Sequence, residues 1–232
     1  MKYESKYALF NYDEKSAYLI GELSNYLDEN AEGIFDFFNV ASREKVIINI
    51  VSTKEEFDLK FINDHSWANV NTQIPKWTVG YYINNQITYL SLDDYKNTTH
   101  AFANKNYNIA LEYYKKTIAH EFVHYVNDLF TKENGCSYTE KYLKEGIATY
   151  LSGQKKEEDL KFDFSLHEIL EKNMNNTCYK GWYILVKYLI ENYDKSFVLD
   201  LFKSNRRARV FLEEELYNKA KERYGKKYER RD

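Results

Sequence analysis

The segment His120-Glu121-Phe122-Val123-His124 has the residue types and spacing of a metal site that activates water. Residues four apart on an α-helix lie one turn apart on the same face, so both imidazoles can bind one ion at about 2.0–2.1 Å. Glu121 lies about 100° around the helix, beside the open coordination position. There it can take a proton from a zinc-bound water, whose pKa the metal lowers to about 7. Only 5 of 232 residues are histidine, so a chance match is rare.

The surrounding pattern predicts a helix over residues 107–131 that buries the side away from the two histidines. Its apolar residues recur at helical spacing: Tyr114, Ile118, Phe122, Tyr125, Val126 and Leu129. At about 100° per residue, His120 and His124 lie roughly 120–160° from Ile118. Such a helix can form the floor of a cleft, or it can simply expose two histidines to solvent. A third ligand decides between these alternatives.

Glu145 is the expected third ligand, on a second helix over residues 139–152. The apolar stripe of this helix consists of Leu143, Ile147, Tyr150 and Leu151. A short turn brings the helix back beside the first one, and Gly146 and Ala148 are small enough to let two helices approach closely. Two histidines and a glutamate leave a fourth position open for water, as a catalytic zinc requires. An ordinary solvated glutamate is the alternative role for Glu145.

These two motifs resemble those of the gluzincin metallopeptidases, which combine H-E-x-x-H with a glutamate on a following helix. The segment from Leu143 to Tyr150 is similar to the L-N-E-G-x-A-x-Y stretch of the aminopeptidase-like gluzincins, with Lys144 in place of asparagine. The resemblance covers roughly residues 78 to 204. It implies a zincin-like fold of the peptidase MA-like kind, one Zn²⁺ held by the three ligands named above, and hydrolysis of peptide bonds with Glu121 as the general base.

Residues 80–90 occupy the place of the edge strand that binds substrate in these enzymes. Gly80, Tyr81 and Tyr82 are therefore the substrate-binding residues that the resemblance implies. Aminopeptidases carry G-x-M-E-N here, and its glutamate holds the free amino end of the substrate. The matching residue of this chain is Ile83. This difference favours an endopeptidase and leaves an aminopeptidase as the alternative within the enzyme class.

A tyrosine that stabilises the oxyanion is the remaining catalytic group that the resemblance implies. The family carries it in a Y-x-K-G segment that leads into a helix, and this chain has Tyr179-Lys180-Gly181. Aligned by the apolar helix positions, Tyr179 matches the catalytic tyrosine. Aligned by the glycine, Cys178 takes that place. With 23 tyrosines in the chain, Tyr179 can also be an aromatic residue at a helix boundary.

The apolar periodicity along the chain predicts an α+β fold. Ser52 with Glu55 and Ser165 with Glu168 have the spacing of capping boxes at helix starts. The expected strands are residues 45–51, 78–83 and 86–91, the last two joined as a hairpin, and the expected helices are residues 14–38, 52–63, 107–131, 139–152, 165–174, 179–192, 195–204 and 206–224.

This order of elements predicts two lobes. Residues 1–131 form a small N-terminal lobe with a mixed sheet, the edge strand and the H-E-x-x-H helix. Residues 132–232 form an all-helical C-terminal lobe that carries the third zinc ligand. One continuous catalytic domain is the alternative, because 232 residues can bury a core as either.

The resemblance implies a peptide or protein substrate, and composition argues against two other classes of partner. The net charge of −3 argues against general nucleic-acid binding, and no stretch approaches the ~18–20 apolar residues of a membrane span. The N-terminus lacks the apolar region of a secretory signal, which favours the cytoplasm, although a trimmed signal would leave secretion open. Two cysteines, Cys136 and Cys178, are too few for a disulfide framework. The sequence leaves the oligomeric state undetermined.

Two functions of other classes stay open. The chain could be a catalytically silent peptide- or partner-binding protein on a gluzincin scaffold. It could also be a latent protease whose basic C-terminal stretch docks on a larger assembly. The intact Glu121 argues against the silent binding protein, because a structural metal site does not need a base.

Overall fold

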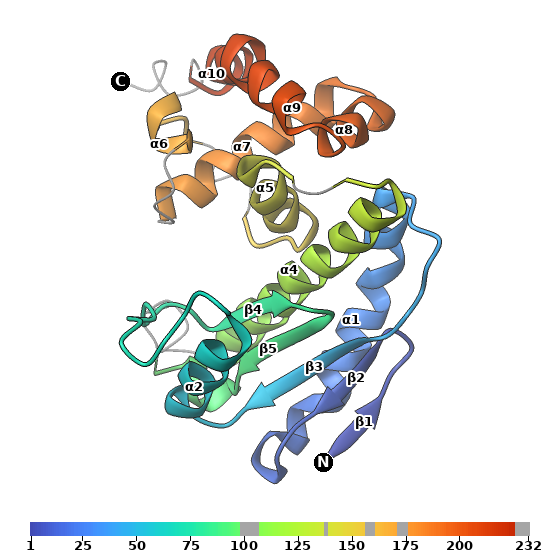
Figure 1. The fold of residues 1–232 in the computed structure, drawn as a ribbon, viewed down its shortest axis with the longest axis vertical. Coiled ribbons are helices and arrows are strands. Elements are labelled where there is room, and N and C mark those ends of the chain that lie inside the picture. Colours follow the sequence, from blue (N-terminus) through green and yellow to red (C-terminus); the bar gives the residue numbers. More distant parts are fainter. Residues whose placement is uncertain (98–106, 137–138, 156–160, 171–175, 226–232) are drawn as a thin grey trace. The chain divides into compact units, whose positions relative to one another are not determined.

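The computed structural model describes the chain except for residues 98–106, 137–138, 156–160, 171–175 and 226–232 (Figure 1). The described residues form an α+β structure with a mixed sheet of five strands, in agreement with the predicted class. They divide into two compact units, Met1–Asp36 with Ala41–Tyr125, and Phe37–Val40 with Val126–Asp232. None of the helices in the described ranges is long and apolar enough to cross a membrane.

Most predicted elements are confirmed within a few residues. The strands are β1 (Lys2–Glu4), β2 (Ala8–Asn11), β3 (Val46–Val51), β4 (Gly80–Ile83) and β5 (Gln86–Leu90). The helices are α1 (Ala17–Phe38), α2 (Lys54–Asp64), α3 (Leu92–Tyr95), α4 (Tyr107–Glu133), α5 (Lys141–Leu151), α6 (Leu166–Leu170), α7 (Asn176–Asn192), α8 (Lys195–Phe202), α9 (Asn205–Phe211) and α10 (Tyr217–Gly225). A π-helical turn, Leu212–Leu216, separates α9 from α10 within the single helix predicted over 206–224. The end of the predicted helix 165–174 lies outside the described residues.

The sheet belongs to the first unit and has the strand order β1-β2-β3-β5-β4. Its three central strands run parallel, and β1 and β4 pair antiparallel at the two edges. Alternate residues make one face apolar, namely Ala8, Phe10, Val46, Ile48, Ile50, Ile87 and Tyr89. Helices α1 and α4 cover this face, and α2 packs on the other (Figure 1). The edge strand β4 is thereby held beside the helix that carries both histidines.

The predicted hairpin across Asn84 and Asn85 is confirmed. Both residues have left-handed backbone angles, with φ of 49° and 61°, which match the turn type that suits two-residue hairpins. Glycine adopts this region most easily, and asparagine tolerates it better than most residues that have a side chain. The turn fixes the register in which Gly80 lies opposite Tyr89.

Three expectations about local structure were wrong or incomplete. Strands β1 and β2 were not predicted, because three and four residues are too few to show a clear alternation. The cap of α2 is Thr53, whose hydroxyl accepts from the Glu56 N–H at 3.2 Å, and not Ser52, whose hydroxyl donates to Asp13. The four-residue helix α3 was not predicted either. The second capping box is confirmed, since Glu168 accepts from the Ser165 N–H at 2.7 Å and donates its own N–H to the Ser165 hydroxyl at 3.2 Å.

Helix α4 is fixed to the first unit by its aromatic side. The Tyr114 hydroxyl donates to the Leu90 carbonyl at 2.8 Å, and the Tyr125 hydroxyl donates to the Glu44 carbonyl at 2.6 Å. Between them, the Phe122 ring packs edge-to-face on Phe35 of α1, with centroids 5.6 Å apart. These contacts confirm the predicted apolar stripe and determine which way the opposite side of the helix faces.

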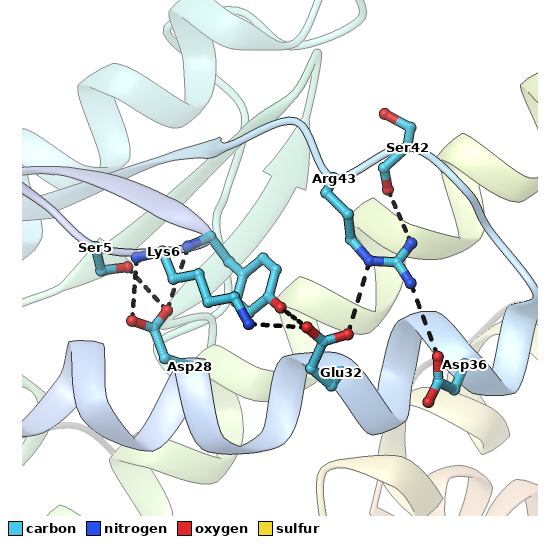
Figure 2. A network of polar contacts seen from close by, with 8 residues as sticks. Ser5, Lys6, Asp28, Glu32, Asp36, Ser42 and Arg43 are labelled. Carbon is cyan, nitrogen blue, oxygen red and sulfur yellow. Dashed lines mark hydrogen bonds and ion pairs between the residues drawn. The ribbon is translucent and has the colours of Figure 1, made fainter.

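Two carboxylates of α1 hold the turn between β1 and β2 and the segment before β3 (Figure 2). Asp28 accepts from the backbone N–H groups of Lys6 and Tyr7 at 3.1 and 3.3 Å. Glu32 accepts from the Tyr7 hydroxyl and from the Lys6 ammonium, and the Arg43 guanidinium lies 3.8 Å away. These donors, the Tyr7 hydroxyl first, lower the pKa of the Glu32 carboxyl.

We predict that Glu32→Gln reduces the acid sensitivity of the fold. A depressed carboxyl pKa adds stability above the ordinary pKa of the group, and this stability is lost as the pH falls through the folded-state value. The melting temperature of the wild type should therefore fall more between pH 7 and pH 3.5 than that of the variant. Thermal unfolding by circular dichroism measures both, with Glu29→Gln, an exposed position of the same helix, as the control. Equal losses in wild type and Glu32→Gln would contradict the assignment.

Candidate metal centre

The structure brings the three predicted zinc ligands together. His120, His124 and Glu145 each offer one ligand atom, and these atoms all lie within 4.8 Å of one another. Their side chains are buried, with exposed fractions of 5, 7 and 8%. Two imidazoles and a carboxylate form a ligand set that zinc takes, and tetrahedral ligands at 2.0–2.1 Å lie about 3.4 Å apart. The cluster could therefore hold a metal ion after small side-chain movements.

Helix α4 places the two histidines as the motif spacing requires. His120 and His124 lie one turn apart, and their ring centroids are 4.7 Å apart with nearly perpendicular planes. The aromatic side of the helix, with Tyr114 and Phe122, is fully buried on the opposite side. The orientation of α4 about its axis that buries these rings therefore also directs both imidazoles toward the same point, the candidate metal position.

Glu121 lies against the backbone of the edge strand. A Cβ atom added to Gly80 would come within 3.6 Å of the Glu121 Cγ and would overlap the ring of Tyr89. Only glycine fits at this position of β4 without a shift of these neighbours. Burial raises the pKa of Tyr89 well above its ordinary value, so this ring adds no negative charge beside Glu121. Tyr89 was not among the predicted site residues, although its place opposite a glycine in the hairpin was a usable signal.

The other predicted substrate-binding residues face opposite sides of β4. Tyr82 is on the α4 side, with its ring 6.1 Å from that of Tyr125. Tyr81 is on the α2 side, where it is buried against Phe57 and donates its hydroxyl to Asp64 at 2.8 Å. The side chain of Tyr81 thus belongs to the packing of α2. As the last strand of the described sheet, β4 has a main-chain edge that can pair with an extended peptide.

Helix α5 carries Glu145 and is packed closely on α7 in the second unit. The contact point is Gly146, where an added Cβ would lie 2.6 Å from the Trp182 carbonyl oxygen and 2.5 Å from the Val186 side chain. The close approach at Gly146 is thus made to α7, whereas the sequence predicted it for the H-E-x-x-H helix. Glu145 precedes this glycine, so the packing of α5 on α7 fixes the position of the Glu145 backbone relative to α7.

Tyr179 lies in the first turns of α7 and is half-buried. Its ring packs edge-to-face on Trp182, with centroids 5.2 Å apart. The alternative residue at this position, Cys178, is buried and its thiol lies 3.3 Å from the Glu168 carbonyl oxygen. These contacts give both residues a place in the packing of α6 and α7, and a catalytic role for Tyr179 stays a prediction.

Comparisons with known proteins add no relative to this description. No protein-family model, curated protein sequence or solved structure matches the chain. The structure shows the α+β class and a buried cluster of two histidines and a glutamate that could hold a metal ion. The gluzincin resemblance, the zincin-like architecture and the identity of the metal stay predictions. The function is therefore argued from the geometry of the site.

We predict that Gly146→Ala weakens both the fold and metal binding. The new methyl group meets the backbone of α7, which cannot move away cheaply, so overpacking should destabilise the protein by about 1–3 kcal/mol. Urea unfolding and zinc titration measure the two effects. Gly21→Ala in α1, where nothing lies within 4 Å, is the control and should stabilise the helix by up to about 1 kcal/mol. Unchanged stability of Gly146→Ala would contradict the packing described for α5.

Proposed function

We propose that this chain is a zinc-dependent metallopeptidase that cleaves within peptide chains. The observation that carries the proposal is the cluster of His120, His124 and Glu145, whose ligand atoms lie within 4.8 Å of one another. Glu121, a further buried carboxylate, lies next in sequence to one ligand. Two imidazoles, a carboxylate ligand and an adjacent glutamate are the parts that zinc hydrolysis of an amide needs.

The proposed chemistry assigns a different task to each residue. His120, His124 and Glu145 would hold the ion, which when bound lowers the pKa of a water and polarises the peptide carbonyl. Glu121 would accept a proton from the attacking water and donate it to the departing amine. Tyr179 would stabilise the oxyanion by donating a hydrogen bond. Because Glu121 is beside β4, a peptide paired with this edge would bring its backbone to the base.

Two features support an enzyme over a silent binding protein. Glu121 is buried, with an exposed fraction of only 9%, and it lies beside the edge strand β4. A buried carboxylate next to a candidate metal site is a common sign of acid–base function. The edge strand also suits substrate better than a fixed partner, since main-chain pairing accepts many sequences. We propose a zincin-like arrangement of edge strand and metal helix on the same grounds.

A peptide-library digest read by mass spectrometry tests the proposal directly. We expect cleavage by the zinc-loaded protein that stops on addition of a chelator and returns with zinc. Cleavage of amino-blocked peptides at internal bonds would support an endopeptidase, and cleavage restricted to free amino ends would support the aminopeptidase alternative. A protein that binds zinc and peptides without any cleavage would instead be the silent binding protein.

We predict that Glu121→Gln keeps its zinc and loses hydrolysis. The amide has the size of the carboxylate but cannot accept the proton, and loss of a general base typically lowers the rate by about 10²–10⁴. Elemental analysis measures the zinc content, and peptide cleavage measures the rate. Glu112→Ala, an exposed position of the same helix, is the control. Wild-type activity in Glu121→Gln would refute the assigned role.

We predict that His124→Ala no longer binds stoichiometric zinc. Removing one of three ligands from the metal leaves a set that holds it far more weakly. Zinc per chain after dialysis, measured by plasma mass spectrometry, should fall well below one. His167→Ala removes an exposed histidine of α6 and should leave the zinc content unchanged. A full zinc complement in His124→Ala would count against the ligand set.

A further inference from the structure

The histidine-bearing side of α4 continues upstream as an exposed apolar stripe. Ile109 and Tyr113 are 46% and 42% exposed. Lys116, the next residue on this side, is half-buried, and His120 and His124 are buried. Exposure thus decreases steadily along one side of the helix toward the metal ligands. This side of α4 therefore connects solvent-exposed apolar side chains with the buried candidate ligands.

Helix geometry places these residues on one line. At about 100° per residue, Ile109, Tyr113 and His124 all lie within roughly 40° of His120 around the axis. Their neighbours Leu111 and Tyr114 face the core and are buried. Ile109 and Tyr113 therefore lie outside the buried side of α4 and present apolar surface to solvent.

The strand that borders the site runs in the same direction as α4. Gly80 lies beside Glu121, and further along both elements Tyr82 lies beside Tyr125. In the other direction, Leu90 donates its N–H to the Val79 carbonyl and accepts at its own carbonyl from Tyr114. The segment before β4 therefore lies alongside the turn of α4 that contains residues 113 and 114. A peptide that pairs with β4 and continues past Val79 would pass this turn.

We infer, on the basis of the proposed function, that Ile109 and Tyr113 form an extended subsite for a bulky apolar side chain of the peptide substrate. Tyr113 lies about 10 Å and Ile109 about 16 Å before His120 along the helix. An extended peptide advances about 3.3 Å per residue. The selected side chain is therefore three to five residues from the cleaved bond. Such a subsite needs substrate well beyond the bond, as an endopeptidase does.

Paired synthetic peptides test this inference on the zinc-loaded full chain. The two peptides of a pair differ at one position, which is Phe in one and Ser in the other. This position is three or five residues from the cleaved bond. One series places it on the amino side of the bond and a second series on the carboxyl side. We expect a higher kcat/KM for Phe on one side, by roughly tenfold, the order of magnitude of one well-placed apolar contact. Tyr113→Ser should bring this ratio close to one at the three-residue position, and Ile109→Ser should do so at the five-residue position.

Matched variants separate the subsite from general effects. Tyr113→Phe keeps the ring and should keep the preference, and Leu59→Ser, which removes an exposed leucine (61%) from α2, should leave it unchanged. Cleavage with the same Phe-to-Ser ratio in wild type and Tyr113→Ser would overturn the subsite while leaving the proposed function intact. A wild-type protein that cleaves none of the peptides would overturn both.

Discussion

The orientation of helix α4 on the first unit is the constraint on which the site depends. Two tyrosine hydroxyls about three turns apart, on Tyr114 and Tyr125, donate to backbone carbonyls of other segments. The aromatic rings between them are packed against α1. A rotation of the helix by one residue would break both hydrogen bonds and expose buried rings. The same orientation brings His120 and His124 together and turns Glu121 toward β4.

Glycine occurs at both places where backbone must come close to a candidate catalytic or ligand carboxylate. Gly80 allows the edge strand to pass beside Glu121, and Gly146 allows α5 to pack on α7 next to Glu145. In both cases a methyl group would displace a whole element, because the neighbouring atoms are backbone or a buried ring. Strand β4 and helix α7 thus lie close to the backbone or side chain of these two glutamates, at contacts where no side chain larger than hydrogen fits. Rigid support of this kind is what a metal or catalytic site requires.

The sequence predicts the long elements of the site well, and the short or long-range features poorly. The H-E-x-x-H helix, the Glu145 helix and the Asn84-Asn85 hairpin carry enough periodic or turn-forming residues to be recognised alone. Strands β1 and β2 span only three and four residues, so alternation cannot identify them. Thr53 caps α2 because Ser52 is engaged by Asp13, a contact across 39 positions. The side to which Tyr81 points likewise depends on a partner outside the hairpin, Asp64 of α2.

X-ray absorption at the zinc edge of the zinc-loaded wild-type protein tests most directly whether one ion joins these side chains. Two imidazole nitrogens and one or more oxygens at about 2.0–2.1 Å, in a four-coordinate shell without sulfur, are expected. A shell that contains sulfur at about 2.3 Å, or that lacks the scattering pattern of two imidazoles, would contradict a centre built from His120, His124 and Glu145.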